Sequence, residues 1–269
     1  MTPDDTLRRS LFGQFVEERH ALPIPGFGVE VLPHFTRYLP ASGSGEGMVM
    51  YTRIAEEEAR GEIREQRRFF ASRNLILEWK VYDLDRPANM RALLEAEGFA
   101  AHHEEVFMVR AVDDEEGREG AAQDRATIRA ATPGNHVIDD IVRVQEETWD
   151  CAFPALAAQL RTALDPGSVD CAIYCAYLDG VPVGTGWIDF IAGSRFADLH
   201  GGAVLEKARG RGIYTLLYRR RVEDARARGC RFLAVDAAPM SRPILQHKGF
   251  MFVCATYPMR TEPRAKRSE

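Results

Sequence analysis

The residues best suited to chemistry stand in the short run Arg209-Gly210-Arg211-Gly212, directly before the apolar residue Ile213. Two glycines let the backbone turn sharply, and a helix beginning at Ile213 would aim its unpaired N–H groups and the positive end of its dipole into that turn. The two arginines add positive charge beside it. The run therefore predicts a site for a pyrophosphate, although a strand-to-helix turn of this composition is often only a turn.

Asp198 and His200 are the candidates for proton transfer, because residues two apart in a strand lie on the same face. An imidazole gains and loses a proton near neutral pH, which suits a general base. His200 also stands directly before Gly201 and Gly202, where a β-bulge would open the sheet. The alternative is a strand histidine that only bonds to a neighbour.

A third set of candidates combines acids with aromatic rings, namely Glu146, Trp149, Asp150 and Phe153. Acidic groups beside aromatic faces suit the binding of a protonated amine. The alternative, of equal weight, is a solvated helix face whose Trp149 lies in the core.

Other features of the chain exclude several kinds of site and partner. No Gly-Lys-Ser or Gly-Lys-Thr marks a Walker loop, and Gly184-Thr185-Gly186 lacks the third glycine of a dinucleotide fingerprint. The five cysteines lack zinc-ligand spacing, so we expect reduced thiols and no metal. The net charge of -5, the absence of a secretion signal and the absence of a long apolar run argue for a cytoplasmic protein, against nucleic-acid partners and against a membrane.

These candidates need a scaffold, and the second half of the chain predicts a mixed α/β fold with an antiparallel front. Asp179-Gly180 predicts a tight hairpin turn, and Phe153-Pro154 predicts a break between helices. Ser241 would cap a short helix that Gly249 ends. The expected strands are 126–131, 170–178, 181–190, 196–205, 230–237 and 250–257, and the expected helices lie within 137–164, 213–228 and 241–249.

The first half repeats part of this order. It predicts strands at 47–54, 75–82 and 105–109, with helices at 55–70 and from Asp85 to Gly98. The run 93–99 parallels 244–250 and ends in the same Gly-Phe, which indicates an internal repeat. Two helices that both happen to end in glycine are the simpler alternative. The charged run 113–125 predicts a linker, so we expect domains at 1–112 and 126–269.

The second half, over residues 126–260, resembles the GNAT superfamily of N-acetyltransferases. The residues that carry the resemblance are Val204, Arg209, Gly212, Ile213, Leu216, Leu217, Ala234, Ser241, Gly249 and Phe250. It implies a tandem architecture with a complete C-terminal GNAT unit, acetyl-CoA as co-substrate, and direct acetyl transfer to a primary amine of a small molecule or peptide. The first half has Glu56-Glu57-Glu58 at the equivalent turn, and these acids would repel a pyrophosphate. We expect a truncated GNAT-like unit there, without cofactor, that closes the substrate side or forms a homodimer.

The resemblance also implies roles for individual residues. It places the general base on the strand of His200 and Asp198, and it places acceptor-binding helices at Glu146, Trp149, Asp150 and Phe153. The implied cofactor contacts are Val204 and Leu205 for the pantetheine arm, Arg209, Gly210, Arg211, Gly212, Ile213 and Tyr214 for the pyrophosphate, and Ser241, Leu245 and Lys248 along the other side.

Two positions depart from the family pattern. Tyr214 stands where the loop usually has Gly or Ala, and Leu245 stands where a Tyr usually protonates the departing thiolate. Either the thiolate leaves without an acid, or a different acid is needed, for which Tyr214 and Tyr218 are the candidates. A non-catalytic CoA-binding sensor or scaffold is the alternative function.

Overall fold

The computed structural model describes residues 3–113, 126–165 and 170–261, and the chain forms two compact units. The first unit comprises Met1–Met108, Asp236–Gln246 and Met251–Glu269, and the second comprises Val109–Val235 and His247–Phe250. None of the helices in the described ranges is long and apolar enough to cross a lipid bilayer. Residues 114–125 of the predicted linker lie outside the described residues.

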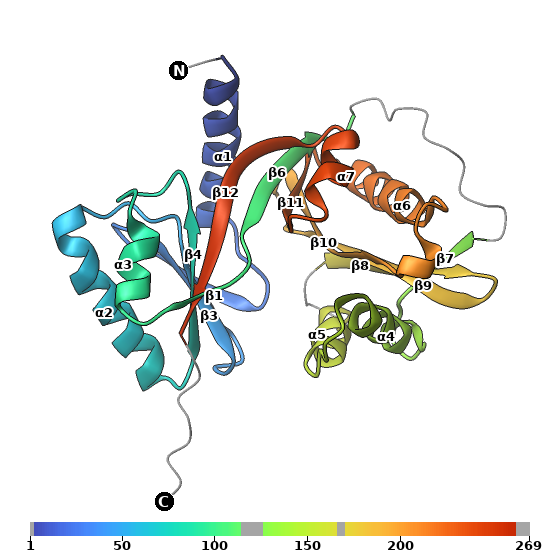
Figure 1. Ribbon diagram of the computed structural model, residues 1–269, viewed down its shortest axis with the longest axis horizontal. Helices are drawn as coiled ribbons and strands as arrows, with labels where there is room; N and C mark the ends of the chain where they lie inside the picture. The colour runs from blue at the N-terminus through green and yellow to red at the C-terminus, as the bar shows by residue number, and fades with distance from the viewer. Residues whose placement is uncertain (1–2, 114–125, 166–169, 262–269) are drawn as a thin grey trace, which may run out of the picture. The chain divides into compact units, whose positions relative to one another are not determined.

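The first unit is built on a mixed sheet (Figure 1). Strands β1, β2 and β3 pair antiparallel in sequence, β3 and β4 are parallel, and β12 pairs antiparallel with both β4 and β5. Strand β6 runs from this unit into the second. The bounds are α1 Pro3–Ala21, β1 Phe27–Val31, β2 Thr36–Pro40, β3 Glu46–Met50, α2 Glu56–Ser72, β4 Ile76–Tyr82, α3 Met90–Ala96, β5 Ala100–Ala101, β6 Glu105–Ala111 and β12 Met251–Arg260.

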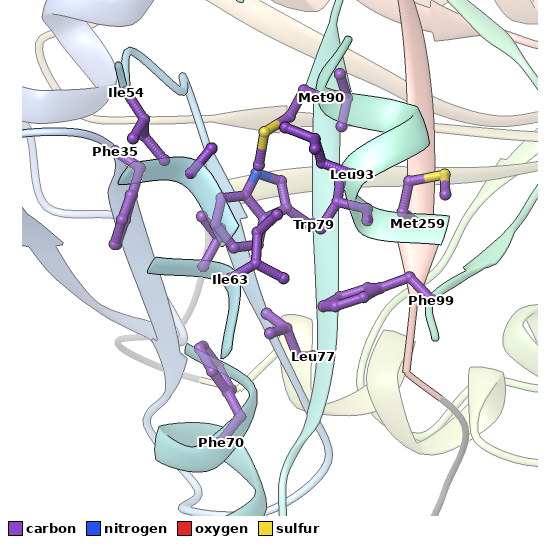
Figure 2. Close-up of a cluster of buried hydrophobic side chains, with 14 of the residues drawn as sticks. Phe35, Ile54, Ile63, Phe70, Leu77, Trp79, Met90, Leu93, Phe99 and Met259 are labelled. Carbon is purple, nitrogen blue, oxygen red and sulfur yellow. The ribbon is translucent and has the colours of Figure 1, made fainter. Parts of the chain in front are cut away.

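The core of the first unit lies between its sheet and the helices α2 and α3 (Figure 2). Trp79 of β4 is fully buried there, and its indole N–H donates to the Thr52 hydroxyl over 2.9 Å. Met259 of β12 lies opposite Trp79 in the strand register and belongs to the same cluster. Strand β12 therefore completes a core whose other residues come from positions 35–99.

The second unit contains an antiparallel run of four strands, β7 to β10, followed by β11, which is parallel to β10 (Figure 1). Helices α4 and α5 lie on one face of this sheet, and α6 lies on the other. The bounds are β7 Ala126–Ala130, α4 Val137–Trp149, α5 Leu156–Ala163, β8 Asp170–Leu178, β9 Val181–Phe190, β10 Phe196–Val204, η1 Glu206–Ala208, α6 Ile213–Ala227 and β11 Phe232–Ala237. Helix α7, Arg242–His247, belongs to the first unit up to Gln246.

Alternation along β8 explains how one sheet supports helices on both faces. Ile173, Cys175 and Tyr177 join the cluster with α4 and α5, whereas Tyr174 and Ala176 join the cluster with α6. Successive strand residues point to opposite faces, so a strand that is apolar at nearly every position is buried on both sides.

The predicted mixed α/β fold with an antiparallel front is confirmed. The hairpin turn at Asp179 and Gly180 is also confirmed, with φ of 53° and 81°. The repeated Gly-Phe occupies equivalent conformations, because Gly98 has φ of 81° and Gly249 has φ of 83°, and the phenylalanine after each is buried. Helix α1 and strands β1 and β2 were not predicted.

The predicted domain boundaries stay a prediction. In the structure, residues 236–246 and the described part of 251–269 belong to the first unit, although the sequence assigned them to the second domain. The physical reason is the pairing of β12, whose backbone bonds to β4 and β5.

Candidate active site

Strand β10 carries a β-bulge, as predicted at its two glycines. Its pairing with β9 is regular up to His200, opposite Trp187, and resumes at Ala203, opposite Thr185. Two residues of β10 therefore stand opposite one residue of β9. The first of them, Gly201, has φ of 57°, and a Cβ on it would lie 1.7 Å from the Trp187 ring. Only glycine fits this position.

Strand β10 also separates from its other neighbour. Its parallel pairing with β11 runs only from Phe196 to Asp198, opposite Phe232 to Ala234, whereas β10 continues to Val204. Among the described residues, the later part of β10 has no strand partner on that edge. Backbone N–H and C=O groups along such an edge can bond an extended ligand.

The loop after β10 leads into the start of α6. Gly210 and Gly212 both adopt positive φ, at 72° and 73°, and a Cβ on Gly210 would meet no atom within 4 Å. Helix α6 begins at Ile213, and the amides of its first turn have no acceptor within the helix. Arg209 and Arg211 are exposed beside them. Unpaired amides, a helix dipole and two cations together fit a pyrophosphate.

Backbone groups at the end of β10 already have partners. The Leu205 amide donates to the Val183 carbonyl over 2.9 Å, and Arg209 Nε donates to the Val204 carbonyl over 3.3 Å. The predicted contacts of Val204 and Leu205 with a pantetheine arm therefore depend on other atoms of these residues and stay a prediction.

On the face of the sheet that carries α4, the imidazole of His200 lies beside an acid. Its Nε2 is 3.4 Å from Asp189 Oδ2, and its ring stacks on Trp187 with centroids 6.5 Å apart. Burial raises the pKa of Asp189, the facing His200 opposes that rise, and Asp198 adds to it. The side chains of His200 and Asp189 are 46% and 31% exposed, so a substrate can reach both. A carboxylate beside an imidazole holds the ring in place and stabilises its protonated form.

A buried network on the same face fixes the bulge. The Gln145 amide nitrogen donates to the Gly201 carbonyl over 2.8 Å and to the Thr185 hydroxyl over 2.7 Å. The Thr185 hydroxyl donates to the same Gly201 carbonyl, also over 2.7 Å. Trp149 Nε1 completes the chain by donating to Gln145 Oε1 over 3.0 Å. The half-exposed indole of Trp149 is thereby linked to the bulge.

On the opposite face, the phenol of Tyr214 lies against the bulge. The position of a Cβ on Gly202 is 3.3 Å from Tyr214 Cε2 and 3.7 Å from its hydroxyl oxygen. The other candidate acid, Tyr218, is buried, and its hydroxyl accepts a hydrogen bond from Arg110 Nη1. Of the two tyrosines, Tyr214 is the one that the structure places at the bulge.

Three other predicted cofactor residues divide between the units. Lys248 Nζ donates to the Thr215 hydroxyl over 3.1 Å, so it lies at the first turn of α6. Ser241 and Leu245 belong to the first unit, where the Leu245 side chain is buried. Their cofactor contacts stay a prediction.

The predicted acceptor residues lie at and after the end of α4. Trp149 is 42% exposed, and Asp150 ends the helix in the left-handed conformation with φ of 50°. Glu146 already has a backbone partner, because its carboxylate accepts the amide of Phe153 over 3.1 Å. The Glu146 carboxylate therefore shapes the connection between α4 and α5.

Three residues of the site were not predicted from the sequence, namely Asp189, Gln145 and Arg221. Asp189 precedes Phe190 at the end of an apolar strand, where nothing in the spacing connects it to His200. The cross-strand register would have identified it, because Asp189 lies directly opposite Asp198. Gln145 lies 56 positions before Gly201, and no local pattern signals such a contact.

The profile of the family "Acetyltransferase (GNAT) family" matches residues 138–244. This range contains α4, the bulge, the loop and α6. No curated protein sequence matches the chain significantly.

Several solved structures resemble the whole chain. A GCN5-related N-acetyltransferase from Kribbella flavida is 13% identical, with a TM-score of 0.64, and the match covers 97% of this chain and 96% of that one. A GCN5-related N-acetyltransferase from Sphaerobacter thermophilus is 16% identical, with a TM-score of 0.59, and the match covers 88% of this chain and 83% of that one. A tandem GNAT protein from the clavulanic acid biosynthesis pathway is 14% identical, with a TM-score of 0.58, and the match covers 91% of this chain and 86% of that one.

These likenesses extend beyond the segment that the family profile matches. They show that the fold is of the tandem GNAT type, with a GNAT-like unit in the first half of the chain. Within this fold, residues 138–244 are the segment whose sequence is similar to the GNAT family of acetyltransferases.

Proposed function

We propose that the protein transfers an acetyl group from acetyl-CoA to a primary amine of a small molecule or peptide. The observation that carries this proposal is the bulge in β10. It has an imidazole–carboxylate pair on one face, a phenol on the other, and an anion-binding loop at the end of the same strand.

The fit to the cofactor rests on the loop and on the free edge of β10. The amides at the start of α6, with Arg209 and Arg211, would hold the pyrophosphate, and the edge beyond Asp198 would bond the pantetheine arm. When bound, acetyl-CoA supplies an acyl carbon that the thioester activates.

His200 and Tyr214 would divide the proton transfers. His200 accepts a proton from the attacking amine as the N–C bond forms, and Asp189 stabilises the resulting imidazolium. Tyr214, whose phenol lies against Gly202, would supply the proton that the departing thiolate needs. His200 thus gains one proton and Tyr214 loses one. Exchange of protons with solvent then returns both side chains to their starting protonation states.

The first unit would act as a scaffold. It has Glu56 to Glu58 at the start of α2, where the second unit has its loop, and negative charge there opposes a pyrophosphate. That the first unit forms a homodimer, and that the protein is cytoplasmic, stay predictions.

The first experiment is a calorimetric titration with acetyl-CoA of the native protein, Arg209→Glu and Gly212→Asp. Arg68→Glu, a charge reversal at an exposed arginine of α2, is the matched control. We expect saturable binding by the native protein and the control, and none by the two loop variants.

A panel of primary amines then tests turnover through release of free thiol. Binding followed by acetylation of one class of amine supports the proposal. Binding without turnover supports the alternative of a CoA-binding sensor, which Leu245 at the usual acid position favours. No binding by the native protein would overturn both.

A further inference from the structure

Arg221 of α6 is a cation in an environment that is unfavourable to charge. It is 1% exposed, and among the described residues it forms no ion pair. Its Nε donates to the Leu217 carbonyl over 3.2 Å, its Nη1 donates to the His200 carbonyl over 3.5 Å, and its buried Nη2 has no hydrogen-bond partner within the described residues. A buried guanidinium without a carboxylate is costly, so its presence calls for a reason.

The sheet makes room for this guanidinium at the bulge. A Cβ on Gly186 would lie 2.9 Å from Arg221 Cζ, and Gly186 is the residue of β9 that faces the two bulge glycines. Arg221 Cζ is 6.0 Å from the centre of the Tyr214 ring. Two paired strands therefore meet these side chains at the bulge, because Gly186 of β9 lies against Arg221 and Gly202 of β10 lies against the Tyr214 phenol.

Charges around the phenol come from two elements. Arg221 approaches it from α6, and Lys248 Nζ, from the segment after α7, is also 6.0 Å from the ring centre. Tyr218 of α6 lies near Lys248, and the strand side is formed by Gly202. Burial raises the pKa of Tyr214, and the positive charge of Arg221 opposes that rise. The ammonium of Lys248 is instead directed to the Thr215 hydroxyl.

We propose that Arg221 is a positioning residue that holds the Tyr214 phenol at the bulge and stabilises the phenolate left after Tyr214 has donated its proton. This inference rests on the proposed function, because it gives the phenolate a part in acetyl transfer. In that step the Tyr214 O–H bond breaks, an S–H bond forms on the departing sulfur, and the negative charge passes from sulfur to the phenol oxygen. Arg221 neutralises this charge without giving up a proton of its own.

The test measures ionisation of the phenol in the cofactor-free protein. Tyr214 is replaced by a fluorinated tyrosine, whose phenol ionises at lower pH, and its titration is followed by fluorine NMR. Arg221→Met removes the charge at similar volume, Arg221→Lys retains it, and Lys248→Met removes the second cation at the same distance from the ring.

We expect Arg221→Met to raise the ionisation midpoint by about 1–3 pH units, the range for loss of a nearby opposite charge. Arg221→Lys should restore part of the shift, and Lys248→Met should move the midpoint much less. An unchanged midpoint in Arg221→Met, or an equal shift in Lys248→Met, would overturn the inference.

A second variant tests the same inference if Arg221→Met does not fold. Gly186→Ala keeps the guanidinium but displaces it through the new Cβ, so it should raise the midpoint in the same direction. No shift in that folded variant also counts against the inference. These titrations are independent of acetyl-CoA, so failure of the proposed function, seen as no cofactor binding, is distinguished from failure of the Arg221 inference.

Discussion

At the scale of single residues, the candidate chemistry depends on two pairs that the sheet brings together. His200 pairs with Asp189 on one face, and Tyr214 lies beside Arg221 on the other. Residue type and strand spacing predicted His200, whereas Tyr214 was a candidate only through the resemblance to the GNAT superfamily. The sequence could not predict Asp189 or Arg221, because their partners are set by strand register and by which face of α6 meets the sheet.

Replacement of His200 by Gln should remove the base and retain the fold. We expect kcat/KM for the acceptor amine to fall by about 10²–10⁴-fold, the usual contribution of general base catalysis. Steady-state kinetics and an acetyl-CoA titration would measure this, with affinity for the cofactor unchanged. His103→Gln, at an exposed histidine of the first unit, is the control. Native-like kcat/KM in His200→Gln would contradict the assignment.

Asp189→Asn should lower kcat/KM for the acceptor amine and leave affinity for acetyl-CoA unchanged. Asp189 Oδ2 lies 3.4 Å from His200 Nε2, where its charge stabilises the imidazolium formed as the base accepts a proton, and Asn keeps the volume but loses that charge. We expect kcat/KM to fall by up to about tenfold, because both groups are partly exposed. Native-like kcat/KM in steady-state kinetics would show that the pair does not operate in the enzyme. Asp170→Asn, at an exposed acid bonded to Arg228, is the matched control.

At the scale of elements, the one strand β10 positions the candidate base, the candidate acid and the candidate cofactor-binding loop. Its bulge separates the base from the acid, its free edge faces away from β9, and its end leads into the loop and α6. The two adjacent glycines allowed the bulge to be predicted. The network of Gln145, Thr185 and Trp149 that fixes it could not be predicted, because it joins α4, β9 and β10 over long separations in the chain.

Gly201→Ala tests how far the bulge depends on the missing side chain. The new Cβ would meet the Trp187 ring in addition to the strain of positive φ. Gly229→Ala has φ of 72° at the parent residue and open space around it, so it measures the strain alone. We expect chemical denaturation to show a loss of about 1 kcal/mol for Gly229→Ala and about 1–3 kcal/mol more for Gly201→Ala. Equal losses would mean that Trp187 moves aside at no cost.

At the scale of the whole molecule, two units with related element order share one chain. The repeat and the mixed fold could be predicted, because periodicity and the shared Gly-Phe are local signals. The membership of β12 in the first unit could not be predicted, because the strand pattern of residues 251–260 does not reveal which strand edge its backbone pairs with. Helix α1 and strands β1 and β2 were missed although Leu11, Phe12 and Phe15 form a buried face on α1.

Met259→Ala should therefore destabilise the first unit. The side chain is fully buried beside Trp79, and truncation of such a methionine costs about 2–5 kcal/mol. Met240→Ala, at a methionine that is 58% exposed, should cost less than about 0.5 kcal/mol. Hydrogen exchange should show faster exchange at the amides of β4 in Met259→Ala, with β8 and β9 unchanged. Faster exchange confined to β8 and β9 would contradict the assignment of β12.

The place of β12 in the first unit has a consequence for synthesis on the ribosome. Strands β7 to β11, which form the sheet of the second unit, all emerge before β12 does. The nascent first unit must meanwhile keep an edge of β4 open, and open edges invite wrong pairing. The half of the chain that is made first is thus the half that finishes folding last, and slow translation after β11 would lengthen the time for which that edge of β4 is unpaired.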